Sequence, residues 1–191
     1  SALYISAIGF YNLKKIHHFS NSIIIIYWCI FMNGLSSFLY HWYALYIFKL
    51  FDEYTMIIPI WLGFSKILLL LNYSSIYIGI ITLFNIIFLI LNIFIWFNYF
   101  GIFFAFEIIF IIPLYIQSLK LYRDKNGYGF KGIIICLGSG IIWIVSETNC
   151  NKYMILGHAI WHIGMSTGLC YIIKYFHIVN SIRFQMTKNI Y

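Results

Sequence analysis

Residues 80–97 read IITLFNIIFLILNIFIWF, a stretch without a charged side chain. A barrel strand that faces lipid alternates apolar with polar residues over about 10 positions, whereas this stretch is apolar on every side. Only a helix carries such a segment through lipid with every backbone N–H and C=O group hydrogen-bonded. The stretch therefore predicts a transmembrane helix, although its Ile and Phe residues by themselves favour strands.

The composition extends this prediction to the whole chain. Its 191 residues are 63% hydrophobic, 22% aromatic and 9% charged, whereas a soluble domain is roughly 45–50% apolar and roughly 25% charged. One core cannot hide such an excess, since a folded monomer of this length still exposes a large surface. The net charge of +7 would suggest a nucleic-acid partner in a soluble chain. In a membrane protein it indicates cytoplasmic loops, so we expect a bilayer and no nucleic acid.

The number of helices follows from the apolar stretches. About 20 mostly apolar residues cross the hydrocarbon, and the stretches that are long enough are residues 22–43, 53–72, 76–96, 99–118, 128–146 and 153–176. Residues 2–13 are apolar but shorter, and we expect them to be the remaining part of a truncated first helix. The sequence thus predicts an all-α polytopic membrane protein, a seven-transmembrane helix bundle in which residues 1–191 form a single domain.

The basic residues predict the orientation. If the chain has seven helices, most of the basic residues lie on one face of the membrane: Lys14, Lys15, Lys120, Arg123, Lys125, Lys131, Lys174, Arg183 and Lys188. The opposite face receives only Lys49 and Lys152. Because cytoplasmic loops carry the excess of Lys and Arg, the N-terminus should be lumenal or external and the C-terminus cytosolic.

Polar groups inside the spans are the functional candidates, because they are expensive in lipid. Ser37 and His41 lie four residues apart near the end of the second helix, so they share one face. Asp52 is expected at the start of the third helix. His158 and His162, in the first turns of the seventh helix, have the i, i+4 spacing with which a helix holds one metal ion.

The predicted topology brings these groups to one depth near the non-basic face. Three imidazoles and an open position are the ligand set of a catalytic zinc ion, and an aspartate beside it can move a proton. Taken singly, His41 would more often be a packed histidine, and the Asp52–Glu53 pair a solvated turn. Their common depth favours a metal site.

Three further residues carry structural predictions. Glu107 in the fifth span and Lys66 in the third should face the bundle interior, because an unpaired charge facing lipid is costly. Trp161 lies about 100° around the helix from His162. It should therefore pack against a neighbouring helix.

The polar residues also match a known family. The chain resembles the alkaline ceramidases, which belong to a seven-helix hydrolase superfamily that includes the adiponectin and progestin receptors. The resemblance covers essentially the whole chain and rests on three motifs: Ser37-x3-His41-x10-Asp52-Glu53-x2-Met56, Glu147-x2-Cys150 and His158-Ala-x-Trp-His162.

This resemblance implies a zinc-dependent intramembrane amidase that cleaves ceramide into a sphingoid base and a fatty acid. By carry-over, His41, His158 and His162 would bind Zn²⁺, Asp52 would act on the zinc-bound water, and Ser37 would support Asp52 and the developing oxyanion. A lipid with two chains also needs an elongated, mostly apolar cavity whose polar groups are concentrated at the His–Asp end. We expect the membrane of the endoplasmic reticulum or Golgi.

Two features depart from the family pattern. Family members carry an acidic Ca²⁺-binding segment ahead of the first helix, and this segment does not precede residues 2–13 in the sequence. A Ca²⁺ site is therefore expected only in a longer family member. Glu147 stands where the family often has aspartate.

Other functions remain open on the same scaffold. A seven-helix receptor with a structural or weakly hydrolytic zinc site is one, and a lipid-remodelling esterase is another. A channel or scaffold would leave the three histidines and Asp52 at one depth unexplained. No oligomeric state follows from the sequence.

Overall fold

The computed structural model describes residues 2–14, 21–94, 100–148 and 154–188, and these residues are helical apart from short turns. The helices are α1 (Ala2–Lys14), α2 (Asn21–Tyr43), α3 (Tyr46–Leu70), α4 (Ser75–Phe94), α5 (Phe100–Leu121), α6 (Tyr128–Thr148) and α7 (Met154–Lys188). Within these ranges there are seven helices and no strand. Helices α2, α3, α5 and α6 are long and apolar enough to cross a membrane. The predicted all-α membrane bundle is confirmed.

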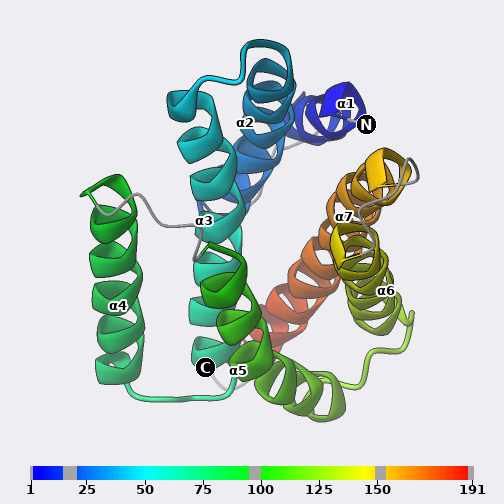
Figure 1. Ribbon diagram of the computed structural model, residues 1–191. Helices are drawn as coiled ribbons and strands as arrows, with labels where there is room; N and C mark the ends of the chain where they lie inside the picture. Colours follow the sequence, from blue (N-terminus) through cyan, green and yellow to red (C-terminus); the bar gives the residue numbers. More distant parts are fainter. Residues whose placement is uncertain (1, 15–20, 95–99, 149–153, 189–191) are drawn as a thin grey trace.

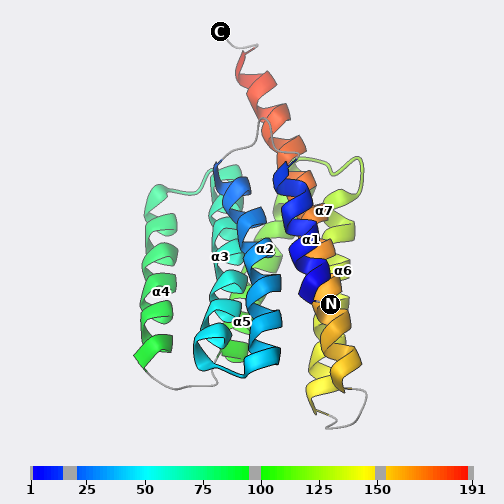
Figure 2. The ribbon, with the colours of Figure 1, turned by 90° about the horizontal axis from the view of Figure 1, so that it is seen from above.

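The helices form two closely packed groups with α5 between them. Helices α1, α2 and α3 lie side by side, α6 and α7 pair as a hairpin, and α4 stands on the outer flank beside α3 (Figure 1). In the second view the α2–α3 turn and the start of α7 lie at the same end of the bundle (Figure 2). The ends of α1, α3 and α7 lie at the other end (Figure 2). The topology thus directs α2, α3 and α7 to a common depth.

Helix α3 begins earlier than the sequence predicts. The expected start was residue 53, but α3 begins at Tyr46 and only two residues separate it from α2. Ala44 adopts a left-handed conformation with φ of 53°, and its backbone N–H donates to the Tyr40 carbonyl at 2.8 Å. The charged residues Lys49 and Glu53 lie within the helix, where they form an i, i+4 ion pair of 3.6 Å. Asp52 therefore lies in the second turn of α3.

Helix α7 is longer than predicted. The apolar stretch ends at residue 176, whereas the helix continues to Lys188. No Gly or Pro occurs in residues 177–188, and the backbone hydrogen bonds of a helix do not depend on apolar side chains. The hydropathy pattern marks the end of the apolar segment and not the end of the helix.

Glycine permits close approach at two helix pairs. A Cβ atom on Gly34 of α2 would lie 2.4 Å from the Ala2 carbonyl oxygen of α1. A Cβ atom on Gly164 of α7 would lie 2.4 Å from the Ser139 Cβ atom of α6. Small residues at such contacts are typical of helix packing in membranes, where close van der Waals contact drives association.

Aromatic stacking joins the second group to α5, as predicted for Trp161. This side chain is 4% exposed, and its ring stacks on Trp143 of α6 at 4.9 Å and 21°. The ring of Phe104 in α5 meets it edge-on at 6.4 Å. The contacts fix the start of α7, which carries the histidine pair.

Candidate metal centre

Three histidine side chains from two helices converge at one end of the bundle. His41 comes from the last turn of α2, and His158 and His162 come from the first turns of α7. One ring nitrogen of each lies within 4.8 Å of the others. The Nε2 atoms of His158 and His162 are 2.9 Å apart, and the His41 and His158 rings meet edge-on at 5.3 Å. The predicted convergence of the three histidines is confirmed, and Asp52 is not part of this cluster.

The donor set fits a zinc ion. Ligands held 2.0–2.1 Å from a tetrahedral zinc ion lie about 3.3 Å from one another, and the ring nitrogens of this cluster lie within 4.8 Å of one another, with one pair at 2.9 Å. Two imidazole nitrogens at 2.9 Å repel each other unless a proton or a cation lies between them. The three histidines differ in solvent exposure. His41 is exposed, His158 is half-buried and His162 is only 3% exposed.

Ser37 connects the two halves of the cluster. Its side chain is fully buried, and its Oγ atom lies 3.3 Å from Nε2 of His162. The contact links α2 to α7 at the depth of the histidines. Ser37 was expected to support Asp52, and the contact found is with a histidine. Its catalytic role stays a prediction.

Asp52 is held by a residue to which the sequence analysis gave no role. The side-chain Nδ2 of Asn33 donates to Oδ1 of Asp52 at 2.8 Å, and it also lies 3.2 Å from the Thr55 hydroxyl. Asn33 is 7% exposed. Its spacing was a usable signal, because Asn33, Ser37 and His41 follow one another at i, i+4 and i+8 on one face of α2.

Glu53 points to a different partner. It is 8% exposed and pairs with Lys49 one turn earlier. The ion pair holds the Glu53 carboxylate beside α3's own Lys49. Adjacent carboxylates on α3 therefore have separate surroundings.

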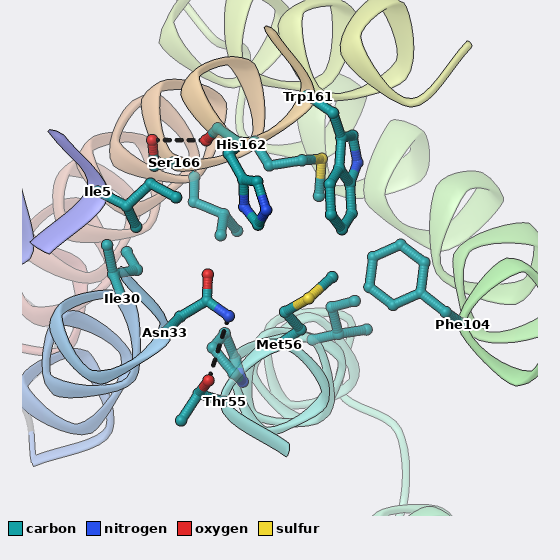
Figure 3. A pocket seen from close by; sticks show the side chains of 13 residues that line it. Ile5, Ile30, Asn33, Thr55, Met56, Phe104, Trp161, His162 and Ser166 are labelled. Atoms are coloured by element: carbon teal, nitrogen blue, oxygen red, sulfur yellow. Dashed lines mark hydrogen bonds between the residues drawn. The ribbon is translucent and has the colours of Figure 1, made fainter. Parts of the chain in front are cut away.

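A pocket lies beside the cluster, and α2, α3 and α7 supply its polar groups. In Figure 3, Asn33 and His162 point into the pocket from opposite sides, while Met56, Phe104 and Trp161 form its apolar wall. A second, apolar cavity continues towards the other end of the bundle, and four residues border both: Pro59, Ile60, Met165 and Leu169. Of the residues in the histidine cluster, His162 is the one that lines either of these two cavities. A single elongated cavity with its polar groups at the His–Asp end stays a prediction.

Glu107 faces inward, as predicted. It is 4% exposed and lies beside the fully buried Asn85 of α4, a neighbour that the sequence analysis missed. Both line a separate hollow between α3, α4 and α5. Lys66 is half-buried. The Glu147 side chain and Cys150, which form the second motif, lie outside the described residues.

The fold and the site together define a helical membrane protein with a three-histidine centre at the end of an apolar intramembrane cavity. The family model named Ceramidase matches residues 1–190, so the chain belongs to the ceramidase family. A search of curated proteins found no match. Membership in this family indicates a hydrolase that acts on the amide bond of ceramide within a membrane.

Proposed function

We propose that this chain is a zinc-dependent intramembrane amidase that cleaves ceramide into a sphingoid base and a fatty acid. The observation that carries the proposal is the cluster of His41, His158 and His162, in which His162 lines a polar pocket that adjoins an apolar cavity. An amide linked to long chains needs this arrangement, because the bond must meet polar groups while the chains stay in apolar surroundings.

Three imidazoles would hold the metal ion and leave one position open. When bound, Zn²⁺ supplies a Lewis acid that polarises a carbonyl group and lowers the pKa of water to about 7. The Asp52 carboxylate would accept the proton that the attacking water loses. It would then return this proton to the nitrogen of the leaving amine as the C–N bond breaks.

Asn33 and Ser37 would prepare the site for this reaction. Asn33 fixes the direction of the Asp52 carboxylate through the 2.8 Å hydrogen bond. The Ser37 hydroxyl, which lies 3.3 Å from His162, would donate to the carbonyl oxygen as this atom gains negative charge. The apolar wall of Met56, Phe104 and Trp161 would exclude bulk water from the reacting amide.

The proposal also covers the membrane in which the protein lies and its orientation there. We infer one transmembrane domain over residues 1–191, with the metal centre towards the lumen of the endoplasmic reticulum or Golgi and the C-terminus in the cytosol. The excess of Lys and Arg on the opposite face supports this orientation.

The test uses the full chain in lipid nanodiscs, with zinc content and ceramide turnover measured together. Wild type should hold about one zinc ion and release fatty acid, whereas the His158→Ala/His162→Ala variant should lose both properties. His177→Ala is the matched control, because His177 is an exposed histidine further along α7. It should retain both.

Two results would favour the other members of the superfamily. Zinc-loaded protein that releases no fatty acid from ceramide would support the receptor function. A faster reaction on an ester of matched chain length than on the amide would support the lipid-remodelling esterase. Turnover that survives loss of all bound zinc would contradict the proposed mechanism.

A further inference from the structure

The apolar cavity below the metal centre has a lining almost free of polar side chains. Helices α2, α3, α5, α6 and α7 contribute to it, and the residues that matter most below are Gly63, Ile67, Tyr115 and Phe176. The lining begins at the residues shared with the polar pocket and ends among aromatic side chains. Such a lining fits a hydrocarbon chain and offers nothing to a polar head group.

The length of the cavity can be read along two helices. His162 and Phe176 are separated by about 21 Å along α7, at 1.5 Å per residue. Asp52 and Ile67 are separated by about 22 Å along α3. Two helices from different parts of the chain therefore give the same distance from the reactive end to the closed end.

Aromatic residues pack together at the far end of the lining. Tyr115 of α5 is 4% exposed, its hydroxyl donates to the Gly129 carbonyl at 3.2 Å, and its ring meets the Phe176 ring at 6.1 Å. The Tyr175 ring meets the Tyr115 ring edge-on at 5.8 Å. A hydrogen-bonded and packed floor resists displacement by an entering chain.

Gly63 keeps the middle of the cavity open. It lies on α3 among the lining residues, and a Cβ atom added there would meet no atom within 4 Å. Gly63 is about 16 Å along α3 from Asp52. A side chain at this position would therefore enter free space above the floor.

We propose that this cavity binds one hydrocarbon chain of the substrate and limits its length, with Tyr115 and Phe176 as the floor and Gly63 as the residue that leaves the lower part accessible. The proposal rests on the proposed function and specifies its substrate. An extended chain advances about 1.25 Å per carbon, as follows from standard bond lengths and angles. The 21 Å depth then accepts a chain of about 16 to 17 carbons.

The test compares wild type with Gly63→Leu across ceramides whose acyl chains range from about 8 to about 24 carbons, and across a matching series of sphingoid bases. The wild-type kcat/KM should fall in one of the two series beyond about 17 carbons. In Gly63→Leu the same fall should occur near 12 to 13 carbons, with shorter chains unaffected. Gly138→Leu is the control, because Gly138 on α6 is exposed and also faces open space; it should keep the wild-type profile.

A binding measurement separates failure of this inference from failure of the proposed function. Free fatty acids or long-chain amines of the same lengths should raise the thermal unfolding temperature of wild type, with a maximum near 16 to 17 carbons. That maximum should shift to shorter chains in Gly63→Leu even without turnover. Chain-length profiles that are identical in wild type and Gly63→Leu, in both turnover and binding, would overturn the inference.

Discussion

The side-chain amide of Asn33 in α2 donates a hydrogen bond of 2.8 Å to Oδ1 of Asp52 in α3. The same nitrogen lies 3.0 Å from the Asp52 backbone carbonyl oxygen. One buried amide therefore fixes both the carboxylate and the helix turn that carries it. Because Asn33 also lines the pocket opposite His162, the relationship ties the direction of Asp52 to the site.

Replacing Asn33 with leucine should reduce catalysis without emptying the metal centre. Leucine has a similar size but no donor, so the Asp52 carboxylate loses its fixed direction. We expect kcat to fall about 10- to 100-fold, with KM and zinc content near wild type. Steady-state kinetics and metal analysis on one preparation measure the effect. The matched Asn12→Leu variant on α1 should keep its kcat, and an unchanged kcat in Asn33→Leu would show that Asp52 needs no orientation.

Asp52→Asn should abolish proton transfer. The amide cannot accept the proton from water, and we expect kcat to fall by at least about 100-fold. Zinc should remain bound, because the three-histidine cluster does not include Asp52. Glu53→Gln, a change to the neighbouring carboxyl group that pairs with Lys49, should keep most of its turnover. Near-wild-type turnover in Asp52→Asn would remove Asp52 from the mechanism.

Gly34→Ala should destabilise the contact between α1 and α2. The new Cβ atom would lie 2.4 Å from the Ala2 carbonyl oxygen, and backbone cannot move aside as a flexible side chain can. We expect a cost of about 1–3 kcal/mol and a lower unfolding temperature in detergent. Gly79→Ala, where a Cβ atom meets nothing within 4 Å, should be neutral or stabilising. Equal unfolding temperatures for the two variants would contradict the close contact.

Trp161→Ala should destabilise the start of α7. Removing a large buried ring leaves a cavity between Trp143 and Phe104, at a cost of about 3–5 kcal/mol. Trp42→Ala provides the comparison, because this ring is 70% exposed and its loss should change stability by less than about 1 kcal/mol. Urea unfolding of both variants in the same detergent gives the difference. A Trp161→Ala protein as stable as Trp42→Ala would mean that the stack contributes no packing energy.

The sequence predicted most of the helices, because a long apolar run has no other stable form in lipid. It failed at the start of α3, where Lys49 and Glu53 neutralise each other and remain helical. It failed again at the end of α7, where no residue breaks the helix after Phe176. Hydropathy reports the surroundings of a segment, whereas helix ends depend on local backbone conformation such as the positive φ of Ala44.

The histidine cluster was predictable because it needs only the alternation of helix direction and the spacing of His158 and His162. The Asn33–Asp52 hydrogen bond was not predicted, since it depends on how α2 and α3 are rotated about their axes. The contact between Asn85 and Glu107 was also not predicted. Asn85 lies on α4, which runs antiparallel to the α5 helix of Glu107. Depth within a bundle can be inferred from sequence more readily than the direction in which a side chain points.

The division of the helices into two closely packed groups has a consequence for assembly. His41 and Asp52 belong to α2 and α3, whereas His158 and His162 belong to the α6–α7 hairpin. A chain cut in the turn between α5 and α6 would therefore leave neither fragment with all three imidazoles. The metal centre would form again only when the two fragments reassociate. The chain could then serve as a split enzyme, in which metal binding or activity reports that the fragments have associated.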